Sequence, residues 1–232
     1  MAIIPAYNEE STTGAVVAKV KPFVDRVYVI DDASTDATAS MAEEAGAIVI
    51  RHEVNQGIAS ALNSGYRAAT EDNARVVVQL DADGQHDPGH LPTLVDALDE
   101  QTEIVIASRF LDGSETSYSF VRKWGIRFFS FLTSVFGGTR ISDVTSGYRI
   151  YRVSALSRIP PSPGRHWAVE QTLIALRLGL RIKEVSVTIP PRLQGESQFR
   201  LGVAALYPIR MTSAILRALR ISRGLRTRSR MS

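Results

Sequence analysis

Short apolar runs rich in β-branched residues alternate with segments of helical composition along the first hundred residues. Such alternation predicts an α/β fold, in which a mostly parallel sheet is covered by helices. The expected strands are Ala2–Pro5, Val27–Ile30, Ala47–Ile50, Val76–Leu80 and Ile104–Ala107. The expected helices are Glu10–Val20, a segment from Ser34 to Ala45 that Gly46 ends, Gly57–Ala69 and Pro88–Leu98.

Polar side chains follow four of these strands at the point where each strand ends. They are Asn8 and Glu9, Asp31 and Asp32, Asp81 and Asp83, and Ser108 and Arg109. In open parallel sheets, ligands bind beyond the carboxyl ends of the strands. The pattern therefore predicts one polar binding site at this edge of the sheet.

The second half of the chain has a different pattern. Residues 119–136 mix large apolar side chains with cations: Trp124, Phe128, Phe129, Phe131 and Phe136 with Arg122, Lys123 and Arg127. These aromatic residues could form core, but the interspersed cations favour a helix at a membrane interface. The remaining elements are expected as a loop entering a strand over Asp143–Arg152, a helix over Val169–Leu178, a strand over Ile182–Ile189, a basic amphipathic helix over Leu201–Leu219 and a frayed last dozen residues. We expect a single domain over 1–200 and a basic amphipathic helix and tail over 201–232.

Charge is divided unequally between the two halves. Residues 1–100 contain 17 acidic and 6 basic side chains, a net charge of −11, whereas residues 101–232 contain 7 and 21, a net charge of +14. An acidic half can hold a cation, and a basic amphipathic helix is typical of a protein that lies on an anionic membrane. Nucleic acid is the competing partner, but the acidic half would repel its phosphates. We therefore expect a membrane surface as a partner and no nucleic acid.

The composition is typical of a folded protein. Of the 232 residues, 44% are hydrophobic, 22% are charged and none is Cys, which excludes disulfides and Cys-ligated zinc. The sequence begins without a basic and apolar leader, and no run approaches the ~18 apolar residues of a membrane span. We expect a cytoplasmic protein that binds peripherally at the inner face of the membrane.

Asp81 and Asp83, with Gln85 shortly after them, form the strongest candidate for a metal site. A hard divalent cation takes oxygen ligands, often one or two carboxylates plus phosphate oxygens of a substrate. The other interpretation is an acidic loop that caps a helix. The position after a buried strand, beside a second acidic cluster, favours Mg²⁺ or Mn²⁺ that neutralises a leaving diphosphate.

Asp31 and Asp32 are the start of that second cluster, which continues to Ser34 and Asp36. Ser34 or Asp36 is suited to cap the following helix. Two adjacent carboxylates exceed what a cap requires. A carboxylate that accepts from a base N–H can hold a nucleobase, so we expect a nucleotide here.

Several motifs together resemble a known enzyme family. IPAYNEE at Ile4–Glu10, DDASTD at Asp31–Asp36, N-x-G at Asn55–Gly57 and QLDADGQHDP at Gln79–Pro88 resemble the inverting family 2 glycosyltransferases, which have the GT-A fold. ASRF at Ala107–Phe110, DVTSGYRIYR at Asp143–Arg152 and EVSVTIPPRLQGES at Glu184–Ser197 are similar to the dolichyl-phosphate mannose synthase group, which includes bacterial polyprenyl-phosphate hexose transferases. The resemblance implies transfer of a mannose- or glucose-type hexose from a GDP- or UDP-sugar to a polyprenyl phosphate.

The resemblance also implies roles for individual residues. Pro5, Tyr7, Asn8, Glu9, Asn55 and Gly57 would line the nucleotide pocket, and Asp32 would meet the base. Asp81 and Asp83 would hold the ribose and the metal-bound diphosphate, with Gln85 as a further metal ligand. Arg109, Arg122 and Arg149 would bind the acceptor phosphate, for which arginine is well suited. Arg149, Arg192 and Ser197 would lie in loops that close over the site.

Alternatives remain open for the acceptor and for the anchor. Many family 2 enzymes that use a hydroxyl acceptor have a QxxRW motif, which this sequence lacks. A phosphate acceptor would explain the absence, since it is largely dianionic at pH 7; otherwise Asp143 or Glu170 is the candidate base for a sugar or natural-product hydroxyl. Many relatives also carry C-terminal transmembrane helices, so a separate small membrane subunit is an alternative anchor.

A receiver-like signalling module is a more distant alternative. Such modules also place an acidic pair after one strand and an aspartate after a later strand, as Asp31, Asp32 and Asp81 do here. That interpretation gives Asp83, Gln85 and the basic second half no role.

Overall fold

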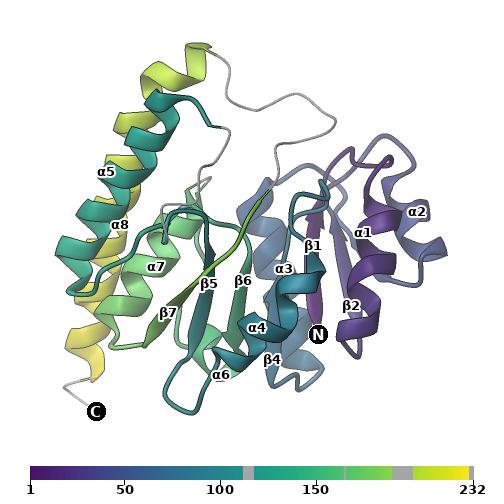
Figure 1. Cartoon of the computed structure of the whole chain (residues 1–232), viewed down its shortest axis with the longest axis horizontal. Coiled ribbons are helices and arrows are strands. Elements are labelled where there is room, and N and C mark those ends of the chain that lie inside the picture. Colours follow the sequence, from purple (N-terminus) through teal and green to yellow (C-terminus); the bar gives the residue numbers. More distant parts are fainter. Residues whose placement is uncertain (112–117, 165, 190–200, 230–232) are drawn as a thin grey trace.

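The computed structural model describes residues 1–111, 118–164, 166–189 and 201–229, with side chains in the last range described from Pro208 to Leu225 and at Thr227. These residues form a seven-stranded sheet with the order β3-β2-β1-β4-β6-β5-β7 (Figure 1). The strands are β1 (Ala2–Ala6), β2 (Val27–Asp31), β3 (Ile48–Arg51), β4 (Val76–Gln79), β5 (Ile104–Ser108), β6 (Arg149–Arg152) and β7 (Ile182–Ser186).

One strand, β6, runs against the direction of the others. β1 is parallel to β2 and β4, β2 to β3, and β5 to β7, whereas β6 is antiparallel to both of its neighbours, β4 and β5. The carboxyl ends of the other strands therefore lie at one edge of the sheet, which we call the rim. The rim includes the loops that follow the last residues of β1, β2, β4 and β5, which are Ala6, Asp31, Gln79 and Ser108. Because β6 runs the other way, the segment just before it enters the sheet at the rim, between β4 and β5.

Helices cover both faces of the sheet (Figure 1). The helices are α1 (Thr13–Val20), α2 (Thr38–Glu44), α3 (Ile58–Glu71), α4 (Leu91–Asp96), α5 (Phe120–Gly137), α6 (Val153–Leu156), α7 (Trp167–Arg177) and α8 (Leu201–Ser229), with short 3₁₀ turns η1 (Lys21–Phe23) and η2 (Pro88–His90). One apolar cluster joins the sheet to α1, α2 and α4, and the other joins it to α3 and α5–α8. Burial on both faces explains why β1 is a continuous apolar run, as parallel strands usually are. The predicted α/β fold is confirmed.

Several helix boundaries differ from the prediction. The helix expected from Ser34 begins at Thr38, because the Ser34 hydroxyl instead accepts the backbone N–H of Asn8. The prediction that the last dozen residues are frayed is wrong for the residues up to Ser229, because α8 continues to that residue. Buried Met211, Ile215 and Ala218 of α8 belong to the same core cluster as α7, and this burial stabilises the long helix.

The aromatic helix α5 is present as expected, but not all of its aromatic side chains face outward. Phe129 is only 2% exposed and belongs to the core, whereas Trp124 is 62%, Phe128 40%, Phe131 61% and Phe136 42% exposed. Phe120, Val121 and Val135 of the same helix are also exposed. Among the described residues, no helix is long and apolar enough to cross a membrane.

Candidate active site

The turn after β4 places the predicted metal-binding residues together on the rim. Asp81, Asp83 and Gln85 are all partly exposed, and the Asp83 carboxylate accepts the backbone N–H of Gln85 at 3.0 Å. Gly84 between them has a φ of +75°, a conformation that other L-residues rarely adopt, so the turn requires glycine there. Three oxygen-bearing side chains thus lie on one short turn.

The loop before β6 passes so close to Asp81 that it requires a glycine there. A Cβ on Gly147 would come within 3.1 Å of Asp81 Oδ2 and 3.3 Å of Oδ1, and the Gly147 carbonyl accepts from Gln79 Nε2 at 2.8 Å. The described residues contain no group of three or more His, Cys, Asp or Glu side chains suited to hold a metal. Two carboxylates and one amide oxygen instead fit a cation, such as Mg²⁺ or Mn²⁺, that completes its shell with water and substrate phosphates.

Buried His86 fixes this turn. Its Nδ1 accepts the backbone N–H of Asp81 at 3.0 Å, and its ring stacks on Tyr148 with centroids 4.9 Å apart. Burial lowers the pKa of His86, although Asp81 and Asp83 oppose the shift. The neutral imidazole therefore carries its hydrogen on Nε2, and its Nδ1 holds the backbone at the start of the turn formed by residues 81–85, which we call the acidic turn.

The loops after β1 and β2 form one surface next to this turn. The Asn8 N–H donates to the Ser34 hydroxyl at 3.0 Å, the Thr35 N–H donates to Asn8 Oδ1 at 2.9 Å, and the Glu9 N–H donates to Thr38 Oγ1 at 2.8 Å. Asn8 has a φ of +54°. The predicted nucleotide-binding residues Tyr7 and Asn8 are exposed here, whereas Pro5 is buried within β1.

Asp32, expected to meet the base, is instead enclosed by protein. Its Oδ1 meets His52 Nδ1 at 2.7 Å and the Gln56 N–H at 2.9 Å, and its Oδ2 accepts the Gly57 N–H at 2.6 Å. His52 Nε2 lies 2.9 Å from the hydroxyl of Ser64 in α3. Asp32 therefore fastens the segment before α3, in which Asn55 is exposed and Gly57 has a φ of +85°. The sequence alone had not suggested His52 as its partner.

On the other side of the acidic turn, Arg109, which follows β5, forms a bidentate ion pair with Asp143. The distances are 2.6 Å from Nε to Oδ2 and 2.8 Å from Nη2 to Oδ1, and both residues are buried. Burial alone would raise the pKa of Asp143, but the hydrogen bonds and charge of Arg109 outweigh it and the pKa is lowered. Glu184 of β7 in turn accepts the backbone N–H groups of Ser142 and Asp143.

Tyr118 links the two arginines that were predicted to bind the acceptor phosphate. Its hydroxyl accepts from Arg109 Nη1 at 2.9 Å, and the Arg122 guanidinium carbon lies 3.8 Å from the centroid of its ring. Arg109 also donates to Thr145 Oγ1 at 2.8 Å. The structure thus brings Arg109 and Arg122 together through Tyr118. Sequence reasoning missed both Tyr118 and Thr145 as partners of Arg109.

Arg149 does not belong to this group, and its prediction is corrected. It begins β6 and does not lie in a loop, and it is 1% exposed. Its guanidinium donates to the carbonyls of Ser146 and Val144 and to Thr172 Oγ1 of α7, so its hydrogen-bonding capacity is used inside the core. Arg192 and Ser197 lie outside the described residues.

Neither candidate base for a hydroxyl acceptor is presented openly at the rim. Asp143 is paired with Arg109, as described above. Glu170 is buried in the first turn of α7, where its Oε1 accepts from Arg217 Nη2 of α8 at 2.6 Å. Each carboxylate therefore balances the positive charge of a different arginine, Asp143 that of Arg109 and Glu170 that of Arg217.

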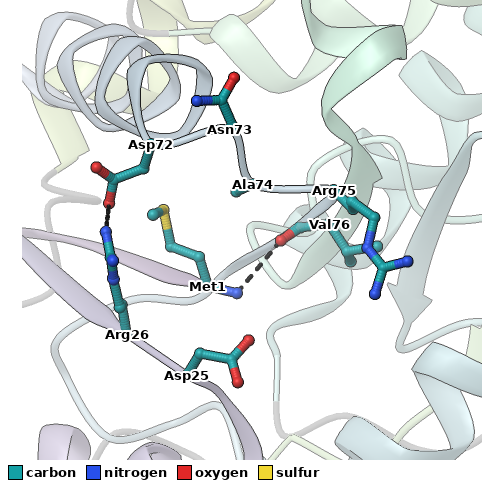
Figure 2. Close-up of a pocket in the computed structure, with 8 residues that line it drawn as sticks. All are labelled: Met1, Asp25, Arg26, Asp72, Asn73, Ala74, Arg75 and Val76. Carbon is teal, nitrogen blue, oxygen red and sulfur yellow. Dashed lines mark hydrogen bonds and ion pairs between the residues drawn. The ribbon is translucent and has the colours of Figure 1, made fainter.

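Three hollows in the described surface differ in their relation to the rim. One, of about 380 Å³, lies at the amino ends of β1 and β4, at the opposite end of the strands from the acidic turn. Figure 2 shows its lining, where Arg26 is paired with Asp72 and the amino group of Met1 with the carbonyl of Val76.

The other two hollows lie at the rim. One, of about 430 Å³, is lined by residues that follow β2 and by residues at and just after the end of β3: Ala33, Ser34, Arg51, His52 and Glu53. The other, of about 320 Å³, is lined by Arg109, Arg122 and Thr145 together with residues of α5 and Pro208 of α8.

The family of this chain follows from comparison with known proteins. The family model described as glycosyl transferase family 2 matches residues 1–159, which include the acidic turn, Arg109 and the loop before β6. The chain belongs to glycosyl transferase family 2. This family 2 chain is 32% identical over 224 residues to an undecaprenyl-phosphate mannosyltransferase of Micrococcus luteus, covering 91% of this chain and 92% of that one.

Two further relatives of this family 2 transferase extend the comparison. It is 30% identical over 216 residues to the polyprenol monophosphomannose synthase of Mycolicibacterium smegmatis, covering 85% and 80% of the two chains. Among solved structures, glucosyl-3-phosphoglycerate synthase from Mycobacterium tuberculosis, in complex with Mn²⁺, uridine diphosphate and glucosyl-3-phosphoglycerate, superposes with a TM-score of 0.70. That match has 23% sequence identity and covers 94% of this chain and 78% of the other, and it shows that the fold is shared.

Proposed function

We propose that this family 2 transferase moves a hexose from a nucleoside-diphosphate sugar to a polyprenyl phosphate, with inversion at the anomeric carbon and with a divalent cation. The two named prenyl-phosphate mannosyltransferases support this, since each aligns over most of both chains. The observation that carries the proposal is the meeting of opposite charges on one rim. The acidic turn of Asp81 and Asp83 follows β4, and Arg109 follows β5, with the loop before β6 between them.

The donor half of the site would use the acidic turn. Asp81, Asp83 and Gln85 would hold Mg²⁺ or Mn²⁺, whose charge neutralises the departing diphosphate. Tyr7, Asn8 and Glu9 would line the nucleoside pocket, because their loop is tied to the 34–38 loop beside the turn. Asp32 would act on this pocket mainly through the segment that it fastens, which contains Asn55 and Gly57.

The acceptor half would use Arg109 and Arg122 to hold a phosphate. A phosphate oxygen forms the new bond to the anomeric carbon while the bond from that carbon to the nucleoside diphosphate breaks. A phosphomonoester has a second pKa of ~6, so at pH 7 it needs orientation more than deprotonation. The pairing of Asp143 with Arg109 and of Glu170 with Arg217 supports a reaction without a protein base.

The experiment that tests the function is a transfer assay with purified protein. GDP-mannose, UDP-glucose and other labelled nucleotide sugars are each mixed with undecaprenyl phosphate in detergent, with Mn²⁺, with Mg²⁺ or with a chelator. We expect a lipid-linked hexose that depends on the cation. Product formation on sugar hydroxyls but on no polyprenyl phosphate would contradict the proposal.

Asp83→Asn tests the acidic turn in the same assay. Loss of a ligand to a cation that stabilises the leaving group by several kcal/mol predicts at least a ~100-fold fall in kcat. Asp96→Asn, which changes an exposed carboxylate on α4, is the matched control and keeps wild-type activity. Full activity of Asp83→Asn with Mn²⁺ bound would remove Asp83 from the site.

We also propose that α5 places the protein on the inner face of an anionic membrane. Phe120, Val121, Trp124, Phe131 and Val135 are each more than half exposed on this helix, which is an unusual concentration of apolar surface. The neighbouring α8 carries exposed Arg210, Arg220 and Arg223, and cations of this kind add about 1 kcal/mol each near anionic lipid. A polyprenyl phosphate resides in such a membrane, so docking would bring the rim to its acceptor.

A further inference from the structure

Two consecutive residues at the end of β3, Arg51 and His52, each bind one of the adjacent carboxylates Asp31 and Asp32. Arg51 Nε lies 3.2 Å from Asp31 Oδ2, and His52 Nδ1 lies 2.7 Å from Asp32 Oδ1. Both residues also line the hollow of about 430 Å³ at this part of the rim. Since β3 is the outermost strand of the described sheet on this side, the two carboxylates are held in place from the edge of the sheet.

Asp32 fixes both ends of the loop that joins β3 to α3. This loop covers residues 52–57, and Asp32 binds His52 at its start and the backbone N–H groups of Gln56 and Gly57 at its end. The side chains of Asp32 and His52 are only 5% and 8% exposed, so water competes little for the hydrogen bond between them. One enclosed carboxylate thus sets the shape of a loop whose middle residues are exposed.

His52 extends this arrangement to α3. A carboxylate accepts hydrogen bonds, which assigns the hydrogen of Nδ1 to the bond with Asp32. The other ring nitrogen, Nε2, lies 2.9 Å from the hydroxyl of Ser64 in α3, and a hydroxyl can donate or accept. A single side chain therefore connects the end of β2, the 52–57 loop and α3.

We propose that His52 is a positioning residue for the nucleotide. The inference rests on the proposed function, in which Asn55 and Gly57 of the 52–57 loop contribute to the nucleoside pocket. His52 acts through Asp32, by holding this loop in the conformation that binds, and not by contact with the sugar that is transferred. A loop that is already ordered loses less conformational freedom when the nucleotide binds, so the affinity is higher.

Two replacements of His52 separate the roles of its ring nitrogens. The amide nitrogen of asparagine can take the position of Nδ1 and donate to Asp32, whereas the amide of glutamine reaches the position of Nε2 and leaves Asp32 without this donor. Titration calorimetry with GDP and with UDP, each with Mn²⁺, measures the affinity for the nucleotide. We expect His52→Asn to bind within about twofold of wild type and His52→Gln about tenfold more weakly, because the loop must then be ordered on binding.

Transfer kinetics distinguish positioning from a general effect on folding. In His52→Gln the KM for the nucleotide sugar should rise about tenfold, while the KM for undecaprenyl phosphate in detergent stays unchanged. Each variant is assayed well below its own midpoint of thermal unfolding, which is measured by circular dichroism. A purely structural role would lower this midpoint and leave both KM values of the folded enzyme unchanged.

Ser64→Ala tests the link to α3, and Ser40→Ala is its matched control. Ser40 is an exposed serine of α2 whose hydroxyl donates to the Ala37 carbonyl. Loss of the outer hydrogen bond of His52 should weaken nucleotide binding about threefold in Ser64→Ala, whereas Ser40→Ala should match wild type.

Two outcomes would overturn these expectations at different levels. If His52→Asn and His52→Gln bound the nucleotide equally well or equally poorly, the hydrogen bond to Asp32 would not set the affinity, although the proposed function would stand. If wild-type protein bound neither GDP nor UDP with Mn²⁺, the proposed function itself would be wrong.

Discussion

At the scale of single residues, the arginine side of the rim contains a charge that the protein has already compensated. Arg109 is paired with Asp143, and the buried ion pair formed by these two side chains has no net charge. Under the proposed function, a phosphate bound here would lie beside the guanidinium groups of Arg109 and Arg122. This pairing fixes where the guanidinium points, which matters more for catalysis than the size of the charge.

Asp143→Asn tests the pair through stability. The change removes the carboxylate that forms a bidentate ion pair with buried Arg109, and loss of one partner of a buried pair costs about 3 kcal/mol or more. We expect the free energy of unfolding, measured by urea denaturation, to fall by that amount. Asp96→Asn, at an exposed site, should stay within about 0.5 kcal/mol of wild type.

The same pair predicts a pH dependence. The pKa of Asp143 is lower in the folded protein than in the unfolded chain, where it is ~3.9. The pair therefore contributes its full stability above about pH 4, and this contribution is lost as the pH falls through the folded pKa. Urea titrations over this range should show a shallower loss of stability in Asp143→Asn than in wild type. An equal slope in both proteins would show that Asp143 does not titrate in this way.

Tyr118 offers a second test at the residue scale. Tyr118→Phe removes the hydroxyl that accepts from Arg109 but keeps the ring beneath Arg122, whereas Tyr118→Leu removes both contacts. A hydrogen bond to a charged group and a cation–π contact are each worth roughly 1–2 kcal/mol. The KM for polyprenyl phosphate should rise about fivefold in the first variant and about 30-fold in the second. Equal KM values for the acceptor in both variants and wild type would contradict this role, and the KM for the nucleotide sugar is the internal control.

At the scale of elements, sequence reasoning located the strands and the rim, but it missed the direction of β6. The ends of β1, β2, β4 and β5 could be predicted because each apolar run stops at a polar residue. The direction of β6 could not, since it depends on pairing between Arg149–Arg152 and strands more than forty residues away in the sequence. For the same reason, the burial of Arg149 and the hydrogen bond between His52 and Asp32 could not be predicted. Both depend on partners that only the fold brings close.

The outer surface of α5 predicts membrane binding that can be reduced without changing the hollow beside Arg109 and Arg122. Phe131 and Val135 are exposed on this helix and do not line that hollow. We expect the double variant Phe131→Ser, Val135→Ser to lose about tenfold in affinity for anionic vesicles, measured by co-sedimentation, because less apolar area enters the interface. Phe23→Ser serves as the control. Unchanged vesicle binding in the double variant would exclude this side of α5 as the docking surface.

At the scale of the whole molecule, the unequal charge distribution has a testable consequence. The first hundred residues carry a net charge of −11 and the remainder +14, so the protein should approach an anionic surface with its C-terminal half first. Raising NaCl from about 0.1 M to about 1 M shortens the Debye length from ~10 Å to ~3 Å. Binding to anionic vesicles should weaken steeply over this range of NaCl. Binding to vesicles of neutral lipid should be weaker than binding to anionic vesicles. Binding that ignores both salt and lipid charge would show that apolar contacts alone anchor the protein.

The reversed strand β6 also limits how this enzyme can be recombined with its relatives. It hydrogen-bonds to β4, which precedes the acidic turn, and to β5, which precedes Arg109. In the loop that leads into β6, Asp143 pairs with Arg109 and Gly147 lies against Asp81. In a chimera joined between β5 and β6, β6 would come from one protein and both strands that it pairs with, β4 and β5, would come from the other. If the loops after β1 and β2 bind the nucleotide as proposed, donor specificity is better exchanged by grafting these loops than by swapping an N-terminal half.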